Sequence, residues 1–252
     1  MSAADKAKHV LNELKCHAPF TLLGAVTGIA MMLAFSDMSY ESSYRLFYIF
    51  HPAHVFLSAM VTASLFRLHE KTKGFLIVLV VGYVGSIGVA TLSDSVLPYL
   101  GEEIMGVAVP RECSVHTQMH SESGFCEHPD HEHHTHHTRR LHLGFIEEWY
   151  IVNPAAILGV IFAYFLPRTR LPHALHILIS TWASSAHIMM NNTQPLGFVL
   201  VVGILIVLFV AVWLPCCFSD IIFPTLLVGS DGCKCHFHAH KKNHSDENQA
   251  KE

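Results

Sequence analysis

The chain contains six apolar segments, each close to the length that a helix needs to cross a lipid bilayer. A hydrocarbon core of about 30 Å is spanned by roughly 20 residues at about 1.5 Å per residue. Backbone polar groups must be satisfied inside the membrane, so such segments fold as helices. The sequence therefore predicts an all-α integral membrane protein with six transmembrane helices, at Pro19–Phe35, Leu46–Phe66, Phe75–Leu92, Leu143–Leu166, His173–Met190 and Phe198–Pro215.

The composition agrees with this prediction. Of the 252 residues, 51% are hydrophobic and only 14% are charged, whereas an ordinary soluble domain is about 25% charged. The first apolar segment has no convincing signal-peptide cleavage pattern, so we expect it to be retained as a span. A multi-pass protein of the cell (inner or cytoplasmic) membrane is the class of protein that these features favour.

The basic residues orient the spans. Cytoplasmic segments carry an excess of Lys and Arg, and an orientation with both termini in the cytoplasm puts 12 of the 16 basic residues on that side. Only Arg45, Arg111, Arg139 and Arg140 then lie outside. We therefore expect both termini to be cytoplasmic.

Three short signatures recur in the same order, once in each half of the chain. They are Pro-x-x-x-Leu-Gly, His-x-x-His-x-x-x-Ser and Ser-Asp-x-x-x-Pro, with offsets of 135, 122 and 126 residues between the copies. Any one match could arise by chance, but three in order, one per span, indicate an internal duplication. The copies are PFTLLG at 19–24 with PAAILG at 154–159, HPAHVFLS at 51–58 with HALHILIS at 173–180, and SDSVLP at 93–98 with SDIIFP at 219–224.

An odd number of spans in each half makes the two halves run through the membrane in opposite directions. This plan resembles the three-plus-three inverted repeats of secondary transporters, whose binding sites lie where the halves meet. We expect a cytoplasmic N-terminal segment at 1–18, a first three-helix repeat at 19–100, a His-rich outer loop at 101–141, a second three-helix repeat at 142–229 and a cytoplasmic Cys/His-rich tail at 230–252.

The repeated His-x-x-His-x-x-x-Ser motif places polar side chains along one face of a helix. Positions i, i+3, i+7 and i+11 share a stripe, and a polar stripe on an apolar helix should face the bundle interior or water. We interpret the hydroxyl positions of each stripe as a transport path between metal ligands. The two stripes are His51, His54, Ser58 and Thr62, and His173, His176, Ser180 and Ser184.

Each histidine pair is followed one span later by an aspartate, which predicts two metal stations at different depths. The outer station would use His51, His54 and Asp94, and the inner station His173, His176 and Asp220. Two imidazoles and a carboxylate suit a divalent transition metal. Zn, Ni, Co, Fe, Mn and Cu all remain candidates, with Zn slightly favoured.

Less specific readings of these residues stay open. A membrane histidine can be a packing residue, and Ser or Thr can bond back to its own helix. Asp94 and Asp220 could instead cap short helices that run to Pro98 and Pro224. We expect the helix to break at these prolines, which would expose backbone carbonyls to a cavity.

Two segments outside the spans are rich in metal-binding side chains. They would capture or buffer the ion, although a biased polar loop and an inert solvated tail are the alternatives. The candidate capture residues are His128, His131, His133, His134, His136 and His137 in the outer loop, and Cys233, Cys235, His236, His238 and His240 in the tail.

Together these patterns predict a secondary transporter of a divalent transition-metal ion. No Gly-x-x-x-x-Gly-Lys-Ser/Thr motif is present, so the energy would come from a gradient rather than from ATP. A membrane-embedded metal-dependent enzyme acting on a lipid or other hydrophobic substrate is the main alternative, and a membrane-anchored metal sensor is a third. The expected partners are the bilayer and metal ions, with no nucleic acid; the sequence leaves open whether the chain forms a homo-oligomer.

Overall fold

The computed structural model describes residues 3–69, 74–106, 143–167, 170–191 and 195–217, and within these ranges the chain is helical with no strand. A helix covers most of each of the six predicted spans. The elements are α1 (Ala3–Ala34), α2 (Tyr40–His69), α3 (Phe75–Thr91), η1 (Leu92–Val96), α4 (Leu97–Met105), α5 (Gly144–Glu147), α6 (Trp149–Phe165), α7 (Arg170–Asn191) and α8 (Phe198–Cys217).

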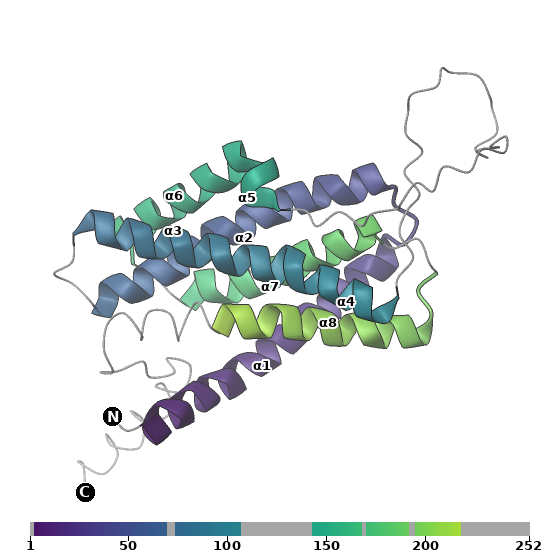
Figure 1. Ribbon diagram of the computed structural model, residues 1–252, viewed down its shortest axis with the longest axis horizontal. Coiled ribbons are helices and arrows are strands. Elements are labelled where there is room, and N and C mark those ends of the chain that lie inside the picture. The colour runs from purple at the N-terminus through teal and green to yellow at the C-terminus, as the bar shows by residue number, and fades with distance from the viewer. Residues whose placement is uncertain (1–2, 70–73, 107–142, 168–169, 192–194, 218–252) are drawn as a thin grey trace, which may run out of the picture.

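Successive long helices run in alternating directions along the long axis of the molecule (Figure 1). Four helical stretches are long and apolar enough to cross a membrane, which indicates a membrane-embedded protein. They are His17–Ala34, Tyr40–Leu68, Phe75–Met105 and Phe198–Cys216.

Helices α6 and α7 are not among these four membrane-crossing stretches, each for a separate reason. The apolar helix α6 has only 17 residues. It follows the short turn α5 instead of forming one continuous span from Leu143 to Leu166. Helix α7 has 22 residues but carries many polar side chains. It packs against α1, α2 and α8, so most of its polar groups contact protein instead of lipid.

The third span does not break at Pro98, contrary to the sequence-based expectation. It continues from α3 through the π-helical turn η1 into α4 and ends at Met105. Pro98 lies in the first turn of α4, directly after η1. Its missing amide hydrogen leaves a carbonyl of η1 without a helical donor, and in this turn the Ser93 carbonyl accepts a hydrogen bond from the Ser184 hydroxyl. Asp94 therefore lies well inside the span Phe75–Met105 and not at its end.

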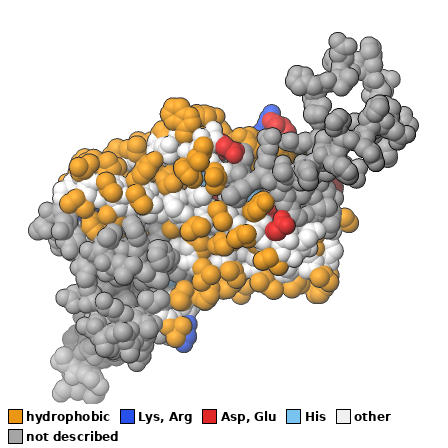
Figure 2. Space-filling view, in the orientation of Figure 1, with side chains coloured by type: hydrophobic (Ala, Val, Ile, Leu, Met, Phe, Trp, Pro, Cys, Tyr) orange, Lys and Arg blue, Asp and Glu red, His pale blue; other side chains and the backbone are white. Residues whose placement is uncertain are grey.

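Hydrophobic and polar side chains are distributed in the opposite way to a soluble protein. Much of the visible surface is hydrophobic (Figure 2), with Ile104, Phe198 and Val199 each more than 80% exposed. A set of histidine, serine and carboxylate side chains, among them His51, Ser180 and Asp94, is instead fully buried between the helices. This arrangement fits a lipid-facing exterior around a polar interior.

Helices pack across the two halves through glycine. A Cβ added to Gly24 of α1 would lie 3.0 Å from the Thr181 hydroxyl oxygen on α7. A Cβ added to Gly159 of α6 would lie 2.8 Å from the side chain of Ala59 on α2, and would also collide with a backbone carbonyl. Small residues let membrane helices approach closely, and here they bring α1 onto α7 and α6 onto α2.

Candidate metal centre

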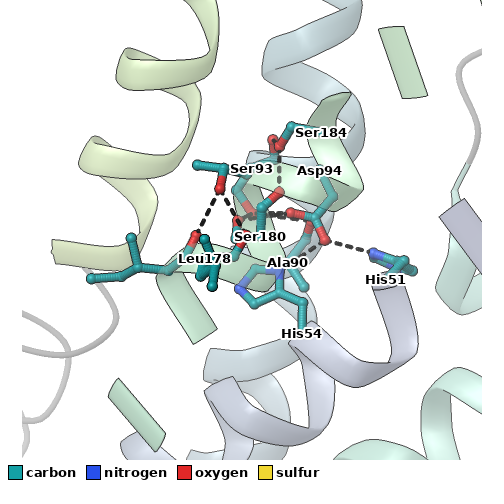
Figure 3. Close-up of polar contacts among 10 residues, drawn as sticks. His51, His54, Ala90, Ser93, Asp94, Leu178, Ser180 and Ser184 are labelled. Carbon is teal, nitrogen blue, oxygen red and sulfur yellow. Dashed lines mark hydrogen bonds and ion pairs between the residues drawn. The ribbon is translucent and has the colours of Figure 1, made fainter. Parts of the chain in front are cut away.

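Asp94 is the centre of the buried polar network. It lies in η1, where the wider π-helical turn interrupts the α-helical register, a feature that often marks functional sites. Its Oδ2 is 2.9 Å from Nδ1 of His51 and 2.8 Å from Nδ1 of His54 (Figure 3). The proximity of these three side chains, which the sequence predicts, is present in the structure.

The second carboxylate oxygen binds hydroxyl groups. Oδ1 of Asp94 accepts hydrogen bonds from Ser93 at 2.8 Å and from Ser180 at 3.0 Å. The Ser184 hydroxyl donates to the carbonyl of Ser93 at 2.9 Å. The alternative role of Asp94 as a helix cap is absent, because no side chain caps α4, whose N-cap position is Val96. Two serines of the second-half stripe therefore bind the π-helical turn of the first half.

These bonds fix the orientation of two imidazole rings. A carboxylate can only accept hydrogen bonds, so the Nδ1 atoms of His51 and His54 donate to it. In the neutral rings Nε2 then carries the lone pair. Among the described residues, neither Nε2 atom has a hydrogen-bond partner, although both rings are fully buried. A carboxylate on one ring nitrogen and a lone pair on the other is the usual arrangement of a metal-ligating histidine.

His54 lies close to two further potential ligands, one from α7 and one from α8. Its ring stacks on that of His176, with centroids 5.7 Å apart and an interplanar angle of 13°. One ligand atom each from His54, His176 and the buried Cys216 of α8 lie within 4.8 Å of one another. Ligand atoms around a tetrahedral zinc ion are roughly 3.5 Å apart. The trio therefore fits such an ion after movements of about 1 Å.

The remaining histidine of the second motif continues this row. His173 lies 5.1 Å from His176 and 4.5 Å from His17 of α1, centroid to centroid. The imidazoles of His54, His176, His173 and His17 thus form a row of contacting rings. The row runs from Asp94 toward the end of the bundle where α7 begins.

The two histidine pairs therefore adjoin each other, instead of forming separate stations near opposite faces. The physical reason is that α2 and α7 pack against each other extensively, with their polar stripes facing each other. The expected separation in depth assumed that Asp94 ends a helix. In the structure Asp94 lies in mid-span, where it also contacts α7 through Ser180.

A carboxylate lies on the other side of His51. A Cβ added to Gly144 would lie 2.6 Å from His51 Nε2 and 3.4 Å from Glu148 Oε2, so both atoms border the same small space. The Tyr44 hydroxyl donates to Oε1 of the fully buried Glu148 at 3.1 Å. His51 thus faces a potential oxygen ligand on the side away from Asp94.

The structure places some, but not all, of the other sequence-predicted residues. Ser58 and Thr62 are fully buried on α2, and Ser58 Oγ has no hydrogen-bond partner among the described residues. Asp220 and all the capture residues lie outside the described residues: His128, His131, His133, His134, His136, His137, Cys233, Cys235, His236, His238 and His240.

From the sequence, Cys216 and Cys217 could either pass metal between the inner station and the tail or form a packing pair, and neither interpretation placed Cys216 beside His54. The repeat gives no signal for it, because its counterpart in the first half is Ala90. Its proximity to His54 follows only from the packing of α8 against α7 and η1.

No protein-family model, curated protein or solved structure matches the chain.

Proposed function

We propose that this protein is a secondary transporter that moves a divalent transition-metal ion across a membrane. The observation that carries the proposal is the convergence of both His-x-x-His-x-x-x-Ser motifs on one buried cluster. Ser180 of the second motif and His51 and His54 of the first bind the same Asp94 carboxylate. A transporter built from inverted repeats binds its cargo where the halves meet.

Helix packing supports the inverted repeat. In such a repeat, α1, α2 and α3 correspond to α6, α7 and α8. Each contact between a helix of one half and a helix of the other should then have an equivalent contact between the corresponding helices. The packing of α1 on α7 and α8 is matched by that of α6 on α2 and α3. The equivalence of the two halves also holds for contacts between single residues. Gly24 abuts Thr181 and Gly159 abuts Ala59, and these pairs are equivalent under the offsets of 135 and 122 residues.

The donor set favours a borderline or soft metal, zinc first among the candidates. Two imidazoles and a thiol from His54, His176 and Cys216 suit Zn, Co or Ni better than Mg or Ca. Asp94 already accepts four hydrogen bonds. Its role in this arrangement is to orient the histidines, while the ion binds to the outward-facing nitrogens.

The ion would move along the row of polar groups that surrounds this cluster. His173 and His17 extend the row toward one end of the bundle, and His51 with Glu148 extends it on the other side of Asp94. The stripe hydroxyls of Ser58, Thr62, Ser180 and Ser184 would line the way. The His-rich loop and the Cys/His-rich tail would capture the ion. Asp220 would orient the histidines of the second motif, as Asp94 orients those of the first.

A membrane-embedded metalloenzyme is the second candidate. The specific observation in its favour is that the ligands gather in one asymmetric centre, with Cys216 present in one half only. Such a centre could activate water for attack on a hydrophobic substrate.

Metal flux in proteoliposomes separates these functions. The full chain and a chain lacking residues 112–138 and 231–252 are assayed with Zn, Mn, Fe, Co, Ni and Cu. Flux that survives the double deletion supports a transporter and excludes a sensor that works through its loop and tail alone. Stoichiometric metal bound in the core without flux of any ion contradicts the transporter and favours the enzyme.

A further inference from the structure

A third buried carboxylate, besides Asp94 and Glu148, lies away from the metal cluster. Glu102 of α4 is fully buried inside the span Phe75–Met105. Its Oε1 is 3.3 Å from Nδ1 of His187, and its Oε2 accepts a hydrogen bond from the Asn191 amide at 2.8 Å. Both partners belong to α7, and His187 extends the polar stripe of that helix by one further turn beyond Ser184. An ionisable residue inside a membrane span usually serves function.

Neither partner of Glu102 carries a permanent charge. The described structure shows no lysine or arginine paired with Glu102, and its two partners are a neutral amide and an imidazole. An isolated carboxylate in an apolar interior is strongly disfavoured, and binding of one cation relieves the penalty. His187 is also fully buried, and its Nε2 has no hydrogen-bond partner among the described residues.

The geometry suits a proton better than a metal ion. Nδ1 of His187 is directed to the carboxylate, so Nε2 lies on the opposite edge of the ring. An ion bound at Nε2 would therefore be far from the Glu102 oxygens, and a three-ligand site could not form. A hydrogen-bonded carboxylate and imidazole can instead share or exchange a proton, as in the proton relays of transporters.

Phe47 separates this pair from the metal ligands. Its fully buried ring stacks on His51 with centroids 5.0 Å apart and makes an edge contact with His187 at 5.8 Å. The pair and the metal cluster are thus distinct sites that share one aromatic neighbour and one helix, α7.

The other titratable groups around the pair are few. Helix α2 contributes His51, which adjoins Phe47, Tyr44, whose hydroxyl binds the buried Glu148, and the exposed ion pair of Glu41 and Arg45. Helix α4 contributes the exposed Glu103 and η1 contributes Asp94. The described part of α8 carries only the thiols of Cys216 and Cys217, at its far end. The titratable residues of α1 all lie in its N-terminal half, between Asp5 and His17, also at the far end. Glu102 and His187 are therefore the groups in this region that can exchange a proton independently of the metal ligands.

We propose that Glu102 and His187 form a proton-binding site, separate from the metal ligands, that binds and releases one proton in each transport cycle. This inference rests on the proposed transporter function and names its coupling ion. The proton enters and leaves as such, so no other reactant is needed.

The direct test records metal and proton movement together. Proteoliposomes containing the full chain and a pH-sensitive dye are given an inward zinc gradient. We expect zinc uptake to change the internal pH in the parent and in the control Glu103→Gln. In Glu102→Gln we expect zinc to move without a pH change, and its flux to become insensitive to an imposed pH gradient. A pH change of parental size in Glu102→Gln would overturn the inference.

Infrared spectroscopy provides a readout that does not need transport. In a pH titration of the detergent-solubilised parent, a protonated buried carboxyl gives a C=O stretch, which should vanish in Glu102→Gln and shift in Glu102→Asp. A stretch that persists unchanged in both variants would contradict proton binding at Glu102. If the parent shows no flux, the transporter proposal fails, while the infrared result still decides whether the pair binds a proton.

Discussion

At the scale of single residues, the central feature is a carboxylate that orients two histidines. The sequence predicts that His51, His54 and Asp94 meet, because the motif spacing and the order of the spans bring them to one region. It does not predict that all four acceptor positions of Asp94 are used within the protein. That result depends on the contact between α7 and η1, which no local pattern encodes. The metal-binding role of these residues stays a prediction.

The first residue-scale prediction concerns Asp94. In the chain without loop and tail, Asp94→Asn should lower the zinc affinity of the core about 10- to 100-fold, because the histidines lose the group that orients them. The matched control is Ser95→Ala, since this buried hydroxyl has no hydrogen-bond partner among the described residues. Calorimetry or competition with a chelating dye measures the affinity. An unchanged affinity in Asp94→Asn would exclude the orienting role.

A second residue-scale prediction concerns Cys216. Co²⁺ bound by the full chain should show a thiolate charge-transfer absorption that is reduced in Cys216→Ser and retained in Cys217→Ser. The physical reason is that a thiolate ligand transfers charge to cobalt, whereas a serine hydroxyl does not. We also expect Cys216→Ser to shift the preference from Zn toward Mn, because a soft donor is replaced by a hard one. Equal spectra for the two variants would remove Cys216 from the metal centre.

At the scale of elements, the apolar segments predict where helices lie but not how they continue or turn. Pro98 suggests a break, yet the chain continues past it as a helix through the π-helical turn η1. There the Ser184 hydroxyl of α7 donates to the Ser93 carbonyl, which satisfies a backbone group beside the proline. The π-helical turn around Asp94 has no signature in the sequence. Helix α7 carries so many polar residues that its hydropathy does not predict a membrane span. These residues are explained by its packing against α1, α2 and α8 inside the bundle.

An element-scale prediction follows from the close approach of α5 to α2. Gly144→Ala should displace the His51 ring, because the added Cβ would lie 2.5 Å from its Cδ2 atom. Overpacking of this kind costs about 1–3 kcal/mol, and we also expect reduced metal flux. The control is Gly88→Ala on α3, where an added Cβ meets no atom within 4 Å. Thermal unfolding and flux are measured together; parental flux and stability in Gly144→Ala would contradict the arrangement.

At the scale of the whole molecule, the proposed transport requires the two halves to be equivalent. The sequence signatures predict the duplication, and the exchange of helix contacts supports it. What the sequence could not reveal is that the two histidine pairs adjoin, because their relative depth depends on how α2 and α7 pack.

The repeat makes a further prediction about two residues of opposite halves. Ser180 donates to Asp94, and the counterparts of these residues are Ser58 and Asp220. The effects of Ser58→Ala and Asp220→Asn on zinc flux should therefore be non-additive, as should those of Ser180→Ala and Asp94→Asn. Contacting residues typically show coupling energies of about 0.5–3 kcal/mol. Additive effects for the first pair alone would argue against a functional inverted repeat.

In the proposed transporter, histidines from both halves bind one transported ion. The most direct measurement is the initial rate of zinc uptake into proteoliposomes by the chain without loop and tail, for His54→Ala and His176→Ala. The controls Ile49→Ala and Leu175→Ala truncate lipid-facing side chains, 61% and 39% exposed, on the same two helices. We predict that either histidine variant abolishes uptake and that both controls retain it. Parental uptake in either histidine variant would contradict the claim.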